Sequence, residues 1–126
     1  MGLDMYLHRR EIGSDGLPEP EICYWRKANQ IRQWIVNHTG YNEKADVVIH
    51  VLTKEQIEAL ISDCQKVLEN HSLAPQIMPT SSGFFFGNSD YDEYYFSVLE
   101  RTVDELNSIL LDTNFDTHEI VYYEWW

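Results

Sequence analysis

The sequence predicts an α+β fold, in which a single antiparallel or mixed sheet includes both ends of the chain and is packed by three helices. Three observations predict this fold. Apolar and polar residues alternate near the N-terminus, the segment 118–126 is rich in Tyr, Trp, Ile and Val, and three stretches between them have apolar residues at helical spacing. We expect residues 1–126 to form one domain, because the chain has no repeat, linker or low-complexity segment.

The first third of the chain predicts a strand, a loop and a helix. Residues 2–8 alternate as a half-buried strand does, and residues 9–20 contain two glycines and two prolines, which favour a loop. A short strand at 22–24 leads into a helix from Trp25 to His38, which Gly40 ends. The apolar residues of this helix form one stripe that would face the core: Ala28, Ile31, Trp34 and Ile35.

The middle of the chain predicts a second strand and a second helix. Val47, Ile49 and Val51 lie two residues apart, the spacing of one face of a second alternating strand. Thr53 and Gln56 have the spacing of a capping box, so a helix begins after Thr53 and continues to about residue 70. Its apolar stripe consists of Ile57, Leu60, Ile61, Cys64, Val67 and Leu68.

The last third predicts a connection, a third helix and a final strand. Residues 71–90 form the connection, and the three phenylalanines at 84–86 are interpreted as one short strand within it. Asp90 and Glu93 have the spacing of another capping box, for a helix at 91–111. Its apolar stripe consists of Tyr95, Leu99, Thr102, Val103, Leu106 and Leu110. Residues 118–126 form the final strand.

Charge is distributed unevenly along the chain. Residues 1–45 carry six basic and six acidic side chains, whereas residues 46–126 carry three and fifteen, so the net charge of −12 belongs to the second part. Such acidity argues against direct binding to nucleic acid or to an anionic membrane, because both need positive surface. The sequence also has no apolar run of membrane-spanning length and no signal peptide, which predicts a cytoplasmic protein.

The segment 24–34 is the basic and aromatic part of this acidic chain. If it is helical from Trp25, then Trp25, Asn29 and Arg32 share one face, and Arg26 and Lys27 lie beside it. An indole can stack on a base, a guanidinium can bind a phosphate, and a carboxamide can contact a base edge or a ribose. The alternative is a solvated helix face, with Trp25 packed under a neighbouring loop.

Lys27 and Asp92 are charged residues that fall on the apolar stripes of their helices. Both would lie in a first helical turn, where a charge can reach solvent or face a cleft. In one interpretation they form a structural ion pair, as charges near a core usually do. In the other, both lie at the rim of a ligand pocket.

Hydroxyl residues and glycines flank the three phenylalanines. Ser81, Ser82 and Asn88 precede the third helix, where backbone N–H groups can form an anion-binding nest. The alternative is ordinary turn chemistry around a buried strand, because no Walker or dinucleotide spacing is present.

No motif predicts catalysis, a metal site or a cofactor. The five histidines lack metal-ligand spacing, and no nucleophile motif is present. Cys23 and Cys64 lie in apolar surroundings without a C-x-x-C pattern, so we expect two buried, reduced thiols.

Three blocks of the sequence are unusual in composition. They are MGLDMYL at Met1–Leu7, the basic and aromatic Tyr24–Trp34, and Pro79–Gly87 with GFFFG, followed by YDEYY at Tyr91–Tyr95. Together they resemble a family of small proteins found in phage, prophage and bacterial genomes, over nearly the whole chain. The resemblance implies a phage-type accessory protein that acts inside a bacterial host cell. The family has His at the position of Arg32, so no catalytic or metal role is carried over to that residue.

Two functions remain open from the sequence. The first is a counter-defence protein that binds and sequesters a small anionic, nucleotide-like ligand without catalysis, using the nine candidate residues Trp25, Arg26, Lys27, Asn29, Arg32, Ser81, Ser82, Asn88 and Asp92. The alternative is an acidic interaction module that blocks a basic host protein by imitating DNA. A homodimer is compatible with both.

Overall fold

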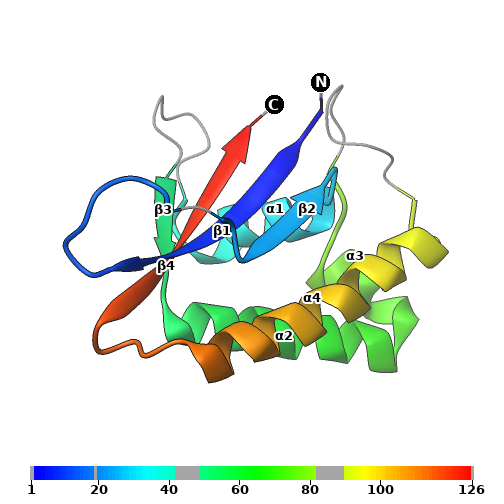
Figure 1. Cartoon of the computed structure of the whole chain (residues 1–126). Helices are drawn as coiled ribbons and strands as arrows, with labels where there is room; N and C mark the ends of the chain where they lie inside the picture. The colour runs from blue at the N-terminus through cyan, green and yellow to red at the C-terminus, as the bar shows by residue number, and fades with distance from the viewer. Residues whose placement is uncertain (1, 19, 42–48, 82–89, 126) are drawn as a thin grey trace.

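Both ends of the chain enter one four-stranded antiparallel sheet. The computed structural model in Figure 1 describes residues 2–18, 20–41, 49–81 and 90–125. In the sheet order β2-β1-β4-β3 the two central strands are the first and the last. The strands are β1 (Asp4–Glu11), β2 (Cys23–Arg26), β3 (Ile49–Leu52) and β4 (His118–Trp125). The prediction of one sheet that uses both termini is confirmed.

The central pair of strands is aligned along its whole length. Asp4 pairs with Trp125 at one end and Glu11 pairs with His118 at the other, so the two ends of the chain lie side by side (Figure 1). β2 adds to the free edge of β1, and β3 adds to the free edge of β4. β4 is therefore hydrogen-bonded on both sides.

The described part of the chain also contains three longer helices and one short helix. They are α1 (Asn29–His38), α2 (Lys54–Glu69), α3 (Ala74–Ile77), which follows the 3₁₀ turn η1 (His71–Leu73), and α4 (Glu93–Asp112). The Thr53 and Gln56 capping box is present, with both of its hydrogen bonds. Because the amide hydrogen bonds of the first turn are satisfied there, α2 begins where the sequence predicts.

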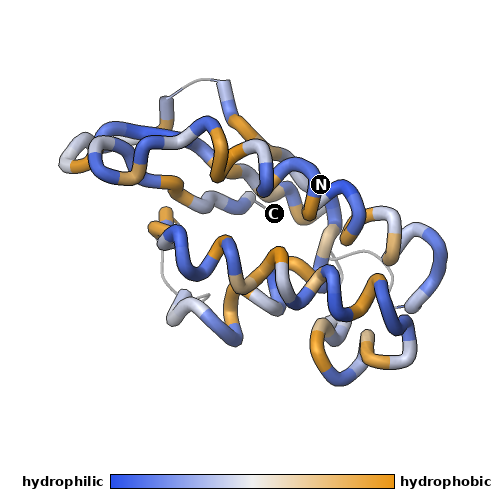
Figure 2. Tube along the Cα trace, turned by 90° about the horizontal axis from the view of Figure 1, so that it is seen from below, coloured by the Kyte–Doolittle hydropathy of each residue, from blue (hydrophilic) through white to orange (hydrophobic). Residues whose placement is uncertain are grey.

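One face of the sheet carries the core. Met5 and Leu7 of β1 and Trp25 of β2 are fully buried, as are Ile120 and Tyr122 of β4. Hydrogen bonds place α1, α2 and α4 on this same face, since Arg32 bonds Glu124 of β4, Trp25 of β2 bonds Thr102 of α4, and Trp34 bonds Asp63 of α2. In Figure 2 hydrophobic and hydrophilic positions are interspersed along the strands and along the helices. Elements with one apolar and one polar side are typical of a two-layer fold. No helix in the described ranges has both the length and the apolar character needed to cross a membrane.

Two predicted boundaries are wrong. The segment from Cys23 to Arg26 pairs with β1 as a strand, so the first helix starts at Asn29 and not at Trp25. The N-cap of α4 is Asp92, whose carboxylate accepts from the backbone N–H of Tyr95, and not Asp90. The strand predicted at 84–86 lies outside the described residues, as does Val47.

Candidate functional site

A pocket lies where the end of β2, the start of α1 and the start of α4 meet. Its volume is about 320 Å³. We call it the junction pocket, and its lining consists of Arg26, Lys27, Asn29, Gln30, Thr80, Asp90, Asp92, Tyr94 and Tyr95. Four of the nine residues predicted from the sequence as ligand contacts are therefore brought together here: Arg26, Lys27, Asn29 and Asp92.

Lys27 forms the corner between β2 and α1. Its φ of 54° lies in the left-handed region, and it is the non-glycine residue with positive φ in the described chain. A lysine in this conformation costs about 1–2 kcal/mol, which glycine would avoid. The Lys27 N–H donates to the Leu3 carbonyl at 2.6 Å, so pairing with the start of β1 holds the corner in place while the side chain remains exposed.

The pocket holds two cations and two carboxylates without an ion pair between Lys27 and Asp92. Neither Arg26 nor Lys27 takes part in any ion pair of the described chain. The Asp92 carboxylate instead caps α4, accepting from Tyr95 N at 3.0 Å. The interpretation of Lys27 and Asp92 as a structural ion pair is therefore wrong, and both residues line the same pocket.

Two buried carboxamides connect the pocket to its surroundings. Asn29 Oδ1 accepts from the Ser81 N–H at 3.0 Å, which fixes the chain where it enters the segment before α4. Gln30 Nε2 lies 3.4 Å from the Tyr95 carbonyl, to which it donates, and so links α1 to α4. The Ser81 hydroxyl is buried beside this contact and has no hydrogen-bond partner among the described residues. Amides that hold three segments in fixed positions make a preformed pocket.

Two tyrosines supply the aromatic surface of the pocket. Tyr94 is 58% exposed and its hydroxyl lies 3.4 Å from the Arg26 carbonyl, so it joins the start of α4 to the end of β2 in the pocket lining. Tyr95 is buried and donates to the Met78 carbonyl at 2.6 Å. Tyr94 was missed from the sequence because it lies one residue from the apolar stripe of α4 and resembles an ordinary exposed position.

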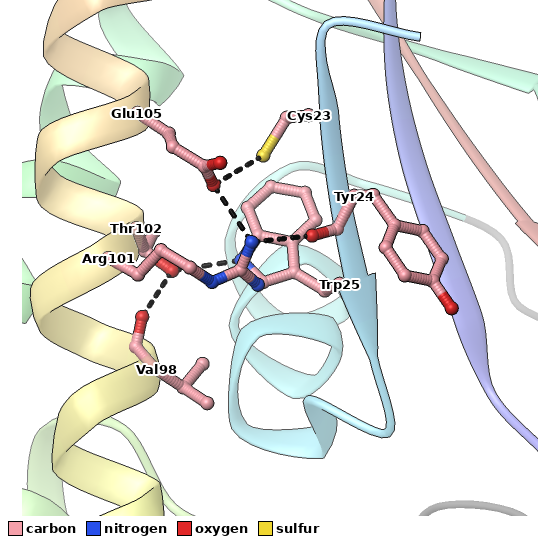
Figure 3. A network of polar contacts seen from close by, with 7 residues as sticks. All are labelled: Cys23, Tyr24, Trp25, Val98, Arg101, Thr102 and Glu105. Atoms are coloured by element: carbon pink, nitrogen blue, oxygen red, sulfur yellow. Dashed lines mark hydrogen bonds and ion pairs between the residues drawn. The ribbon is translucent and has the colours of Figure 1, made fainter.

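Trp25 does not reach the junction pocket. Its indole points from β2 toward α4, is fully buried, and donates from Nε1 to Thr102 Oγ1 at 2.9 Å (Figure 3). The Thr102 hydroxyl in turn donates to the Val98 carbonyl at 2.7 Å. The expected stacking of Trp25 on a ligand is therefore excluded by its burial. The error follows from reading residues 25–28 as helix, because strand alternation turns Trp25 inward and Arg26 outward.

The surroundings of Trp25 belong to the fold. Arg101 of α4 donates to the Tyr24 carbonyl at 2.7 Å and to Glu105 at 3.1 Å, and the Cys23 thiol lies 3.3 Å from the same Glu105 oxygen (Figure 3). Burial, followed by the nearby Glu105 carboxylate, raises the pKa of Cys23 far above its ordinary value. Burial also raises the pKa of Cys64 to about 12. Both thiols are free and buried, as expected, and neither is an activated nucleophile.

Arg32 is also absent from the pocket. Its side chain is buried and its Nε donates to both carboxylate oxygens of Glu124, at 2.9 and 3.0 Å. The predicted phosphate contact of Arg32 is therefore not supported.

Ser82 and Asn88 lie outside the described residues, and Ser81 lies next to the pocket through its bond to Asn29. The other pocket residues were not predicted from the sequence as ligand contacts: Gln30, Thr80, Asp90, Tyr94 and Tyr95.

Within the described ranges no three His, Cys, Asp or Glu side chains are grouped as metal ligands. Comparison of the chain with models of protein families, with curated proteins and with solved structures found no match.

Proposed function

We propose that this chain is a binding protein that holds a small anionic, nucleotide-like ligand in the junction pocket and sequesters it without catalysis. The observation that carries the proposal is the position and charge environment of Arg26 and Lys27. In a chain with 21 acidic residues and a net charge of −12, both cations line a pocket, and neither forms an ion pair with a described residue. A ligand anion would supply the missing partner.

The backbone at Lys27 supports the same conclusion. A strained conformation at a non-glycine residue persists where the surroundings enforce it, and such residues cluster at ligand sites. Here the strain turns a lysine toward the pocket at a corner where glycine would be the more stable choice. A ligand-binding role would account for a cation at this position.

The remaining lining favours a nucleotide over a simple anion. Phosphate would lie at Arg26 and Lys27, while the carboxylates of Asp90 and Asp92 would accept hydrogen bonds from hydroxyl or amino groups of a sugar or base. The exposed ring of Tyr94 can stack on a base. A volume of about 320 Å³ is at the lower end for ligand pockets, which suits one mononucleotide-sized molecule.

The biological role proposed for this binding is that of a phage-type accessory protein in the cytoplasm of a bacterial host. It rests on the resemblance of the three sequence blocks, and sequestration of a nucleotide signal would counter a host defence. The second candidate function is the acidic interaction module. The fifteen acidic residues among residues 46–126 favour it, since they would attract a basic host protein.

A thermal-shift series tests the proposal. The probes are inorganic phosphate, AMP, ADP, cyclic AMP and cyclic dinucleotides, because a ligand at 100 times its Kd adds about 2.7 kcal/mol to stability. We expect one or more nucleotides to raise the Tm of the wild type but not of Arg26→Gln or Lys27→Gln. Lys54→Gln, which removes an exposed cation in the first turn of α2, is the control and should keep the shift.

Salt dependence separates the two candidate functions. A pocket with two phosphate contacts should lose affinity about tenfold or less between 50 and 200 mM salt, whereas a surface that engages many charges should lose several orders of magnitude. No shift with any nucleotide, together with strongly salt-dependent capture of a basic protein, would favour the interaction module.

A further inference from the structure

The helix-free face of the sheet carries a row of aromatic side chains. Residues paired across antiparallel strands lie on the same face, and the register places Tyr24, Tyr6, Tyr123 and Ile49 in one row across all four strands. The ring of Tyr6 lies 5.3 Å from that of Tyr24 and 5.9 Å from that of Tyr123, measured between centroids. The layer of helices covers the opposite face, so this row is not part of the core.

A groove lies at one side of this row. The segment between β1 and β2 folds over the strand face, where His8 Nδ1 lies 2.8 Å from the Pro18 carbonyl. Between this segment and the strands is a groove of about 290 Å³, lined by Tyr6, His8, Leu17, Glu21, Tyr123 and Trp125. Trp125 is 66% exposed, which is unusual for an indole and leaves its ring open to a partner.

The charged side chain among the described residues that line the groove is acidic. Of the lining residues described, Glu21 is the charged one, and it is exposed. Asp4 lies next to the groove, with Trp125 as its cross-strand neighbour on β4 and Arg26 on β2, and it accepts from the Tyr24 hydroxyl at 2.6 Å. Arg10, at the far end of β1, is paired with Glu119 at 2.7 Å. Aromatic rings therefore lie close to carboxylates here, and no lysine or arginine of the described chain lines the groove.

This combination is suited to an organic cation. The faces of Tyr and Trp rings attract ammonium and guanidinium groups, and aromatic sites with a nearby carboxylate recognise such groups in many proteins. We propose that the groove binds a lysine or arginine side chain of a basic segment in a partner protein. The net charge of −12 would draw such a segment to the surface, and the groove would then hold one of its side chains.

The same features disfavour two other occupants. Stacked nucleic-acid bases would bring phosphates to a groove that offers no cation, against the charge of the whole protein. A second copy of this chain would bring the same carboxylates and another charge of −12. The proposal does not depend on the junction pocket, because the two sites share no lining residue.

The test uses isothermal titration of the full chain with hepta-lysine and hepta-arginine, with hepta-glutamate as the control peptide. We expect Trp125→Ala to weaken binding of the basic peptides about three- to thirtyfold, and Glu21→Gln to weaken it about three- to tenfold. The matched control is Val51→Ala, which removes an exposed apolar side chain from the same face and should leave affinity unchanged. Far-UV circular dichroism and Tm report whether each variant is folded.

Equal affinity in all folded variants would show that peptides respond only to the overall charge, and would overturn the groove as a site. Sedimentation that detects a wild-type dimer, lost in Trp125→Ala, with no difference in peptide affinity would assign the face to self-association instead. Tetramethylammonium binding with the same dependence on Trp125 and Glu21 would support the cation chemistry.

Discussion

Arg32 and Glu124 form a buried ion pair that joins α1 to the central strand β4. The exposed fraction is 3% for the arginine side chain and 1% for the glutamate side chain, and Nε lies 2.9 and 3.0 Å from the two carboxylate oxygens. The Tyr122 hydroxyl donates to the same carboxylate at 2.7 Å, and burial raises the pKa of Tyr122 well above its ordinary value. This cation therefore serves the fold, while Arg26 and Lys27 are left for the pocket.

Removing one member of this pair should destabilise the protein strongly. Arg32→Met and Glu124→Gln each leave polar or charged groups buried without their partner, so we expect each to lower the free energy of unfolding by about 3–5 kcal/mol. The double variant should lose less than the sum, because the uncompensated charge is gone. Urea denaturation of the four proteins provides the measurement, and additive losses would show that the two residues act independently.

Trp25→Phe should weaken the fold without touching ligand binding. The change removes the hydrogen bond to Thr102 and leaves a cavity in a fully buried site, which predicts a loss of about 2–4 kcal/mol. Nucleotide affinity of the folded fraction should stay unchanged, because the indole does not line the junction pocket. If affinity falls tenfold or more at a temperature where the variant is folded, Trp25 does contribute to ligand binding.

His50 should make stability depend on pH on the acidic side. Burial lowers the pKa of His50 from its ordinary value, an effect partly opposed by a backbone hydrogen bond with Thr39. A lowered folded-state pKa means that the stabilising contribution is complete above about pH 6.5 and is lost as the pH falls below it, because the unfolded state takes up the proton first.

An NMR titration of the imidazole signals measures this pKa, with His50→Gln identifying the His50 resonance. A His50 signal that titrates at pH 6.5 or above would contradict the prediction. In urea denaturation at pH 7.5 and pH 5.5, the wild type should lose more stability than His50→Gln does.

Lys27→Gly should remove ligand affinity without harming the fold. Relief of the left-handed strain gains about 1–2 kcal/mol, and the greater freedom of glycine in the unfolded chain offsets about 0.4–1 kcal/mol of that. The net expectation is unchanged stability or a gain of up to about 1.6 kcal/mol. Lys27→Gln keeps the strain and removes the same charge, so it is the matched variant. A Gly variant less stable than the Gln variant would show that the strain assigned to this corner is wrong.

Most of the fold follows from local patterns in the sequence. Alternation identified β1, the content of Tyr, Trp, Ile and Val identified β4, the Thr53 capping box placed the start of α2, and the apolar stripe of the first helix is buried as predicted. These succeed because each depends on neighbours in the chain. The start of α1 failed because Cys23–Arg26 is a strand only through its pairing with β1, which lies about twenty residues earlier.

The composition of the site was predictable only in part. Arg26, Lys27, Asn29 and Asp92 were found from charge and position, but the assignment of Arg32 required knowledge of its partner. One signal was available, since Glu124 falls in phase with the buried Ile120 and Tyr122 of β4. An acidic residue at a core position of a strand needs a buried cation, and Arg32 was among the few in the chain.

Backbone NMR of the full chain tests the junction pocket most directly. The measurement is the change in amide shifts when the nucleotide with the largest thermal shift is titrated into wild type and Lys27→Gln. We expect the largest changes at residues 26–30, 80–81 and 91–95, which surround the pocket, and their loss in Lys27→Gln. Changes centred on the aromatic groove at Tyr6 and Tyr123, or no saturable change with any nucleotide of the panel, would contradict the proposal that this pocket binds an anionic ligand.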